Sequence, residues 1–193
     1  MRDLAALSFI TLDGVMQAPT SPDEDPSGGF RNGGWAAPYW DGVMPHVEAT
    51  AMAAPYDILL GRKTYDLFAA HWPSAEASTI SDRLNAARKH VATATPLSIP
   101  WKNSRALSGD LADAVRQLKA GEGPLLQIHG SAHLIGSLLR HDLIDEFRIW
   151  MFPVVVGGGK RLFEGKAPPA SLRLTASHAL PNGVVSLVYR TER

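Results

Sequence analysis

Two glycine-containing segments hold the residue types that are best suited to binding a charged ligand. One reads LLGRKTY over residues 59–65, and the other reads LLQIHGSAH over residues 125–133. Each combines an apolar run, a glycine and an expected helix start, and the free N–H groups of a helix N-terminus favour phosphate. We therefore predict that the two segments bind the two ends of one dinucleotide. The alternative interpretation is that each glycine only permits a tight turn.

Two adjacent cations, Arg62 and Lys63, distinguish the first segment from the second. The helix dipole disfavours a cation at a helix N-terminus, which indicates a functional reason for both residues. Arginine binds phosphate through paired hydrogen bonds, so the two cations favour NADP over NAD. Neither segment matches the GxGxxG or Walker patterns of nucleotide-binding loops.

Histidines and carboxylates supply the remaining candidates for chemistry. His129 and His133 are spaced as zinc ligands on a helix would be, but no third ligand is near them in sequence, so we expect no metal. Glu48 and Asp13 are candidate acids in a pocket, although a glutamate at a helical position is more often solvated. The chain has no cysteine, which excludes thiolate nucleophiles and disulfides.

The elements that position these residues follow from hydrophobic periodicity. Short apolar runs bounded by turn residues predict strands over residues 4–10, 57–61, 90–95, 105–108, 125–129, 145–156, 172–178 and 183–189. Apolar residues at helical spacing predict helices over residues 41–53, 62–70, 81–89, 110–120 and 130–139, with Ser81 as the N-cap of the third. Strands that alternate with helices imply a mostly parallel sheet covered on both faces. The turn Pro181-Asn182-Gly183 predicts a closing antiparallel hairpin.

Length and composition favour one α/β domain over residues 1–193. The chain has 193 residues, of which 45% are hydrophobic and 20% charged, as is usual for a single globular domain. Lys+Arg and Asp+Glu both number 19, so charge gives no argument for a nucleic-acid or acidic-membrane partner. No apolar run has the length of a membrane span and no signal-peptide pattern is present, so we expect a cytoplasmic protein.

Residues 17–40 contain many prolines and glycines and are predicted to form a long loop. A loop of this length inside a compact domain usually serves as a lid or as a wall of a substrate site. Trp35, Tyr39 and Trp40 lie at the C-terminal end of this loop. They are predicted to form an aromatic wall against which a flat ring stacks. Packing of the loop itself explains the same three residues equally well.

Four segments, in this order along the chain, resemble a known family. They are SFITLDGV (8–15), GGWAAPYWD (33–41), LLGRKTYDLFAAHWP (59–73) and the stretch from HGSAH to LFEG (129–165). They resemble the dihydrofolate-reductase-like proteins that share a fold with the reductase domain of riboflavin biosynthesis, and in particular their small stand-alone members. The resemblance covers nearly the whole chain and implies one α/β domain around a mixed, mostly parallel sheet of about eight strands.

The resemblance also implies NADPH as the cofactor and assigns a place to each site residue. The adenosine phosphate would lie at the helix start in the first glycine-containing segment, against Gly61, Arg62, Lys63 and Thr64. Thr93 would lie on the adenosine side. The pyrophosphate would lie against Gly130, Ser131, Ala132 and His133. The nicotinamide and its ribose would lie near Ala6, Asp13 and Gly14.

This chain departs from the family pattern on the substrate side. Dihydrofolate reductases have two adjacent glycines where this chain has His129 and Gly130, and riboflavin-pathway reductases commonly have a substrate-contacting glutamate in place of the first. The Gly–Gly bond of dihydrofolate reductases is cis, so a cis peptide is considered between residues 129 and 130. The acid that protonates folate would fall near residues 45–49, where Glu48 is the only acid.

We expect an NADPH-dependent reductase of a small pterin- or pyrimidine-like heterocycle, with Glu48, His129 or a bound water as the proton source. One alternative is an NADP(H)-binding dimeric protein without turnover, in a regulatory or scaffold role. Another is the riboflavin-pathway 5-amino-6-(5-phosphoribosylamino)uracil reductase itself, which needs a cationic site for a ribose phosphate that the sequence does not identify. The long apolar strand and its neighbours suggest a homodimer.

Overall fold

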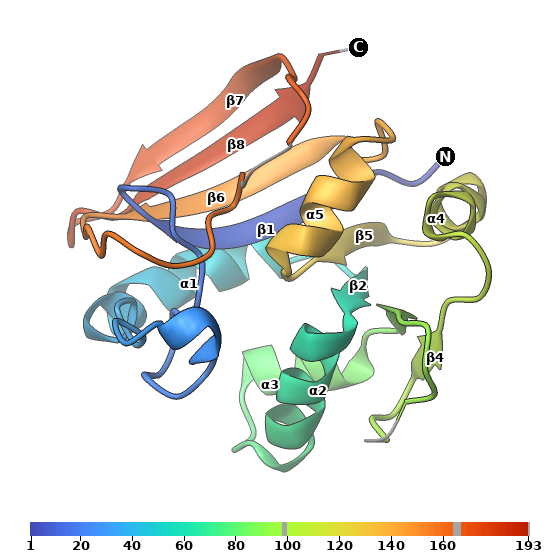
Figure 1. Cartoon of the computed structure of the whole chain (residues 1–193), viewed down its shortest axis with the longest axis horizontal. Helices are drawn as coiled ribbons and strands as arrows, with labels where there is room; N and C mark the ends of the chain where they lie inside the picture. Colours follow the sequence, from blue (N-terminus) through green and yellow to red (C-terminus); the bar gives the residue numbers. More distant parts are fainter. Residues whose placement is uncertain (98–99, 164–166, 193) are drawn as a thin grey trace.

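A single eight-stranded sheet with helices on both faces organises the chain (Figure 1). The computed structural model describes residues 1–97, 100–163 and 167–192. The strands are β1 (Leu4–Thr11), β2 (Tyr56–Gly61), β3 (Lys89–Ala92), β4 (Ser104–Ala106), β5 (Leu125–Ile128), β6 (Glu146–Phe152), β7 (Leu172–Ala179) and β8 (Val185–Thr191). The α-helices are α1 (Trp40–Ala51), α2 (Arg62–His71), α3 (Thr79–Ala86), α4 (Leu111–Ala120) and α5 (Ala132–Leu139). Short 3-10 turns cover Ser27–Gly29, Ala37–Tyr39 and Trp72–Ser74.

The sheet is parallel except at its C-terminal end. Its order is β4-β3-β2-β5-β1-β6-β8-β7, and every pair from β4 to β6 is parallel. Strand β8 runs antiparallel to both β6 and β7. Gly183 closes the final hairpin with a positive φ of 86°, a conformation that glycine adopts readily. The predicted mixed sheet and closing hairpin are confirmed, and β7 lies at the edge.

Two hydrophobic cores cover the two faces of the sheet. Ala5 and Leu7 of β1 point into one core, and Leu4 and Ala6 point into the other, because successive side chains of a strand face opposite sides. The first core includes residues of α1, α2 and α3, and the second includes residues of α4 and α5. Each helix thus buries its apolar side against the sheet, as the periodicity predicts.

Some predicted boundaries are wrong by a few residues. Helix α3 begins at Thr79, and Ser78 is its N-cap, while Ser81 completes a capping box three residues later. Lys89 belongs to β3 and is fully buried; its ammonium group donates to the carbonyls of Asn85 and Lys102. Strand β6 ends at Phe152 because Pro153 has no N–H for the ladder.

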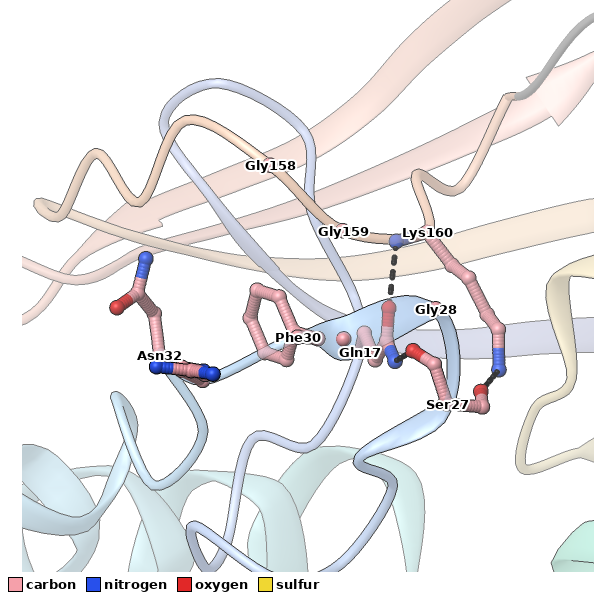
Figure 2. Close-up of a pocket in the computed structure, with 10 residues that line it drawn as sticks. Gln17, Ser27, Gly28, Phe30, Asn32, Gly158, Gly159 and Lys160 are labelled. Carbon is pink, nitrogen blue, oxygen red and sulfur yellow. Dashed lines mark hydrogen bonds between the residues drawn. The ribbon is translucent and has the colours of Figure 1, made fainter.

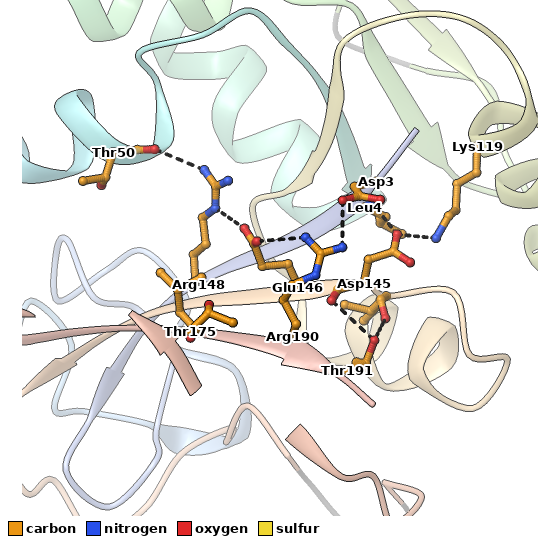
Figure 3. A network of polar contacts seen from close by, with 12 residues as sticks. Asp3, Leu4, Thr50, Lys119, Asp145, Glu146, Arg148, Thr175, Arg190 and Thr191 are labelled. Atoms are coloured by element: carbon orange, nitrogen blue, oxygen red, sulfur yellow. Dashed lines mark hydrogen bonds and ion pairs between the residues drawn. The ribbon is translucent and has the colours of Figure 1, made fainter. Parts of the chain in front are cut away.

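A polar network holds the amino-terminal end of the central strands (Figure 3). The Asp145 carboxylate accepts from the Leu4 N–H at 2.8 Å and pairs with Lys119 of α4, and both charged side chains are buried. Arg190 of β8 donates to Asp3 at 2.9 Å. These contacts lie at the end of the sheet opposite the carboxyl ends of the parallel strands. The carboxyl ends, where α/β sheets usually bind ligands, are therefore left for a site.

Two further observations concern the helices and the extent of the described residues. None of its helices combines the length and the apolar character that crossing a membrane requires. The last part of the family-like stretch 129–165, residues 164 and 165, lies outside the described residues.

Candidate functional site

The two glycine junctions lie side by side at the carboxyl edge of the sheet. Strands β2 and β5 are parallel neighbours, with Leu59 opposite Ile128. A Cβ atom added to Gly61 would lie 3.1 Å from Ser131 Oγ, so the two junctions are in contact. The shared rim that the sequence predicts is therefore confirmed, and one dinucleotide is long enough to contact both junctions.

The first junction connects α2 to the loop after β3 through Arg62. The Arg62 guanidinium donates to Asp66 at 2.8 Å and to the Thr95 hydroxyl at 2.7 Å. It also donates to the Pro96 carbonyl at 2.8 Å. Thr93 belongs to the same loop, and its hydroxyl accepts from the Thr95 N–H at 3.1 Å. Two predicted adenosine-side residues, Arg62 and Thr93, are thus brought together around Thr95.

The second junction is shaped by Gly130 and Ser131. Gly130 has a positive φ of 82°, and the Ser131 hydroxyl caps α5 by accepting from the Leu134 N–H at 3.4 Å. The peptide bond between Gly130 and Ser131 is cis. The cis bond that was considered between His129 and Gly130 is therefore wrong by one residue.

His129 precedes this junction and lies in an apolar surrounding. Its ring stacks on Tyr56 at 5.9 Å between centroids and meets the edge of Phe68 at 6.3 Å. Its Nε2 lies 3.0 Å from Gln127 Oε1. Burial lowers the pKa of His129 to about 4, so the ring is neutral at pH 7. His129 therefore carries no extra proton to supply under neutral conditions.

A cleft of about 290 Å³ opens beside the second junction. Seven of the predicted site residues line it: Trp40, Lys63, Thr64, His129, Gly130, Ser131 and Ala132. Its apolar walls come from strand β1, helix α1 and helix α2, and include Phe9, Met44 and Phe68. The cleft thus joins the phosphate-binding candidates to a space suited to a flat ring.

Ten predicted site residues are not among the described residues that line this cleft: Ala6, Asp13, Gly14, Trp35, Tyr39, Glu48, Gly61, Arg62, Thr93 and His133. Gly61, Arg62, Thr93 and His133 belong to the two junctions or to the loop next to them. The others lie elsewhere, each for a physical reason.

The residues predicted on the aromatic wall divide between core and cleft. Trp35 is buried, its Nε1 donates to the Gln17 carbonyl at 2.9 Å, and its ring packs on Phe152. Tyr39 also packs on Phe152. Of the three aromatic residues, only Trp40 reaches the cleft, where it meets the edge of Phe9 at 5.3 Å. For Trp35 and Tyr39, the alternative of a packed loop matches the structure.

Neither Glu48 nor Ala6 is among the described residues that line the cleft. Glu48 follows Trp40 and Met44 at a spacing of four residues and so lies on the same side of α1, but Trp40, Met44 and Val47 line the cleft and Glu48 does not. Ala6 faces the opposite core, whereas Leu7, Ser8 and Phe9 line the cleft. The structure therefore gives no support to Glu48 as the acid.

Asp13 holds two loops together. Its carboxylate accepts from Thr11 Oγ1 at 2.6 Å and from the Gly157 N–H at 2.9 Å. The Thr11 hydroxyl, followed by backbone N–H groups of residues 156 and 157, holds the pKa of Asp13 below its ordinary value. Gly14 has a positive φ of 82° in the same turn. Asp13 and Gly14 therefore shape the loop that precedes the cleft residues Met16, Gln17 and Ala18.

Sequence reasoning missed the polar residues that the loop over 16–25 brings to the cleft, although it predicted a wall or lid there. Glu24, Asp25 and Lys160 all line the cleft. The Lys160 ammonium group pairs with Asp25 and donates to Ser27 Oγ at 2.6 Å. Burial opposes ionisation of Asp25, but the hydrogen bonds from Lys160 and Ser27 hold its pKa below the ordinary value. No local signal pairs residues so far apart.

The same loops line a second, open pocket of about 460 Å³, shown in Figure 2. Gln17 lies at its base, donates to the Ser27 carbonyl at 2.9 Å and accepts from the Lys160 N–H at 2.9 Å. Gly158 and Gly159 form part of its rim. Gln17 thus joins the loop over residues 16–30 to the loop over residues 157–160. These hydrogen bonds stabilise the wall of the cleft to which both loops contribute.

No group of three or more potential metal ligands gathers in the described ranges. His133 is exposed in the first turn of α5, whereas His129 points into the apolar surroundings of Tyr56 and Phe68. The two histidines therefore do not form a pair at this junction.

The sheet order, the closing hairpin and the cleft at the carboxyl edge define a dihydrofolate-reductase-like α/β domain. The chain belongs to the family described as the RibD C-terminal domain, whose model matches residues 3–186. In sequence it is 30% identical over 136 residues to the uncharacterized protein YyaP of Bacillus subtilis, across 68% of this chain and 72% of that protein. A second uncharacterized protein of that organism, YwjB, is 40% identical over 58 residues, across 30% of this chain and 33% of YwjB.

Three solved structures share the fold. A protein of Shewanella sp. PV-4 with a provisional riboflavin-biosynthesis description has a TM-score of 0.71 at 20% identity, over 99% of both chains. A pyrimidine reductase-like protein of Corynebacterium diphtheriae has a TM-score of 0.60 at 12% identity, over 100% of this chain and 92% of that one. Dihydrofolate reductase of Enterococcus faecalis, complexed with NADP(H) and RAB-propyl, has a TM-score of 0.61 at 14% identity, over 99% and 97%.

Proposed function

We propose that this protein is an NADPH-dependent reductase of a small, flat heterocycle of the pterin or pyrimidine type. The observation that carries the proposal is the contact between the two glycine junctions on one rim, beside a cleft with apolar walls. Membership of the RibD C-terminal domain family and a fold shared with an NADP(H)-bound dihydrofolate reductase support the same class of reaction.

The residues of the rim fit the phosphates of NADPH. Arg62 and Lys63 supply two cations for the 2′-phosphate, and Thr64 adds a hydroxyl at the start of α2. At the second junction, the first turn of α5 supplies N–H groups for the pyrophosphate. A Cβ atom on Gly130 would make ordinary van der Waals contact with Thr64 Oγ1 at 3.7 Å and with Met16 Cε at 3.8 Å, so the glycine leaves the space beside these two side chains free.

The nicotinamide of a bound NADPH supplies a hydride, and the chain supplies orientation and a dry surrounding for it. Phe9, Trp40 and Met44 form apolar walls that stack a flat ring and displace water. In this proposal Asp25 is ionised through its contact with Lys160, and His129 is neutral. The proton then comes from a bound water rather than from Glu48 or His129.

The test is a fluorescence titration of the purified chain with NADPH and with NADH, followed by assays with dihydrofolate and with the riboflavin-pathway pyrimidine. We expect NADPH to bind more tightly than NADH and the absorbance of the reduced cofactor to fall when a substrate is added. Binding of neither cofactor would contradict the proposal.

An NADP(H)-binding protein without turnover is the second candidate. It is favoured by the charge states in the cleft, because an ionised Asp25 and a neutral His129 have no proton to give at neutral pH. Tight NADPH binding without oxidation by any pterin or pyrimidine offered would favour this candidate. Oxidation that depends on the added heterocycle would exclude it.

We also propose that the chain forms a homodimer through strand β7. This edge strand is exposed along nearly its whole length, and the Leu174 side chain is 48% exposed. An unpaired strand edge is a ready template for another chain. Light scattering on a sizing column should give the mass of two chains, and Leu174→Lys should halve it while the control Val155→Lys does not. A monomer mass for the unchanged chain would contradict this proposal.

A further inference from the structure

Gln127 is a polar side chain buried in the middle of the sheet. It lies on β5 between Ile58 of β2 and Ala5 of β1, and only 1% of it is exposed. A buried amide is costly unless its polar atoms have partners. Both ends of the Gln127 amide have one: Nε2 donates to the Ala51 carbonyl at 2.6 Å, and Oε1 lies 3.0 Å from His129 Nε2.

These two contacts fix the position of the proton on His129. The Ala51 oxygen, at the last residue of α1, only accepts hydrogen bonds, so the NH₂ group of Gln127 must face it. The amide oxygen therefore faces His129, and it also only accepts. The imidazole proton must then lie on Nε2, which leaves Nδ1 with a free lone pair.

The Nδ1 atom with the free lone pair belongs to a residue that lines the cleft. His129 lines the cleft, and its Nδ1 has no hydrogen-bond partner among the described residues. Tyr56 stacks on the ring, and Phe68 closes one edge. Burial lowers the pKa of His129 to about 4 and raises that of Tyr56 to about 12, so neither changes charge between pH 5 and pH 8.

We propose that His129 Nδ1 accepts a hydrogen bond from a ring N–H or amino group of the ligand, and that Gln127 is the positioning residue that fixes this acceptor. This inference deepens the proposed function, since it concerns the same cleft. It narrows the substrate class to heterocycles that present an N–H donor at this point. It also replaces the predicted role of His129 as a proton source with the role of a neutral acceptor.

Trp150 adds an independent observation. Its side chain lines the cleft, and its Nε1 donor is buried without a partner in the described part of the chain. The His129 acceptor matches a ring N–H group, which a pteridine-dione carries beside its C=O groups. Lumazine, a pteridine-dione, has both, and 1,3-dimethyllumazine keeps the carbonyls but loses the ring N–H groups.

The first test needs no ligand. Long-range proton–nitrogen NMR of the ¹⁵N-labelled chain reports which nitrogen of each histidine carries the proton. We expect His129 to carry it on Nε2 throughout pH 5 to 8. A proton on Nδ1, or a positively charged ring in this range, would overturn the proposal.

The second test compares the two lumazines by calorimetric titration. We expect the unchanged chain to bind lumazine about 3- to 10-fold more tightly than 1,3-dimethyllumazine, the ratio typical of one hydrogen bond. His129→Phe keeps an aromatic ring and should bring the ratio close to one. Equal affinities in the unchanged chain, binding of neither compound, or an unchanged ratio in His129→Phe would each overturn the proposal.

A third variant separates positioning from packing. Gln127→Met has a similar volume without polar atoms, so we expect both tautomers of His129 in the NMR spectrum and a lower lumazine ratio, with NADPH affinity unchanged. The exposed Gln117→Met is the matched control and should change neither readout. A single Nε2–H tautomer in Gln127→Met would show that Gln127 does not position the ring.

These experiments distinguish failure of the acceptor role proposed for His129 from failure of the reductase proposal. Tight NADPH binding together with equal lumazine affinities overturns only the acceptor role of His129. Selective lumazine binding without NADPH binding overturns only the redox function.

Discussion

The junction between β2 and α2 presents permanent charge, whereas the junction between β5 and α5 presents none. Arg62 and Lys63 begin α2, and no side chain caps that helix. Ser131 caps α5, and the neighbouring His129 is held neutral by burial. In the proposed function, the first junction therefore selects the ligand by the charge of its side chains, and the second binds it through backbone N–H groups and by shape.

The glycines of the two junctions, Gly61 and Gly130, also differ in backbone conformation. Gly61 has an extended backbone with a φ of −74°, which any residue adopts, whereas Gly130 has a φ of 82°. At Gly61 the lack of a side chain matters because Ser131 Oγ lies so near. At Gly130 it matters because of the backbone itself. The two positions use glycine for different physical reasons, although they contribute to one rim.

The largest expected effect concerns the neutral histidine of the second junction. Its pKa of about 4 in the folded chain lies below the unfolded value of 6.5, so the unfolded chain binds more protons between these values. The stabilising contribution is full above pH 6.5 and is lost as the pH falls toward 4, by about 3 kcal/mol in the free energy of unfolding. Urea unfolding at a series of pH values measures this loss.

His129→Phe is the control for this pH dependence. His46 and His90 also have lowered pKa values and remain in both proteins, so the difference between the two curves isolates His129. The variant curve should be flatter between pH 6.5 and pH 4. Parallel curves would mean that His129 titrates at an ordinary pKa.

The next effect tests charge recognition at the first junction. Arg62→Ala should raise the dissociation constant of NADPH about 10- to 100-fold, because a charge-assisted hydrogen bond contributes about 1.5–3 kcal/mol. NADH, which lacks the 2′-phosphate, should be affected much less. Arg116→Ala removes a surface ion pair on α4 and serves as the control in the same fluorescence titration. Equal weakening of NADPH and NADH would show that Arg62 does not recognise the 2′-phosphate.

A third prediction compares the same substitution at the two glycines. Gly130→Ala forces a left-handed backbone on a residue with a side chain and should cost about 1–2 kcal/mol in the free energy of unfolding. Gly61→Ala needs only a small movement of Ser131 Oγ and should cost less. Urea unfolding of both variants measures the difference. A larger loss at Gly61 would reverse the distinction drawn between the two junctions.

The smallest effect concerns the cap of α5. Ser131→Ala removes the acceptor for the Leu134 N–H and should lower the free energy of unfolding by about 1 kcal/mol. It should weaken NADPH and NADH to the same extent, in contrast to Arg62→Ala. Ser137→Ala, further along the same helix, is the matched control. A preference of the Ser131 variant for one cofactor would place charge recognition at the second junction as well.

Much of the fold was predictable because periodicity is a local property. The alternation in β1 separates Leu4 and Ala6 from Ala5 and Leu7, and that separation builds both cores. The shared rim followed from two strand–glycine–helix patterns in a parallel sheet. The aromatic wall was less predictable, because Trp35 and Trp40 have the same chemistry and only packing on Phe152 separates them.

The sequence by itself determined the class of fold, the order of its elements and the place of its two junctions, since apolar spacing and turn residues act over short distances. Only the tertiary structure decided the contact of His129 with Gln127, the pairing of Asp25 with Lys160 and the absence of Glu48 from the described lining of the cleft. Gln127 meets Ala51 across 76 residues of sequence, and Lys160 meets Asp25 across 135. Such contacts depend on how the whole chain packs, which no local pattern specifies.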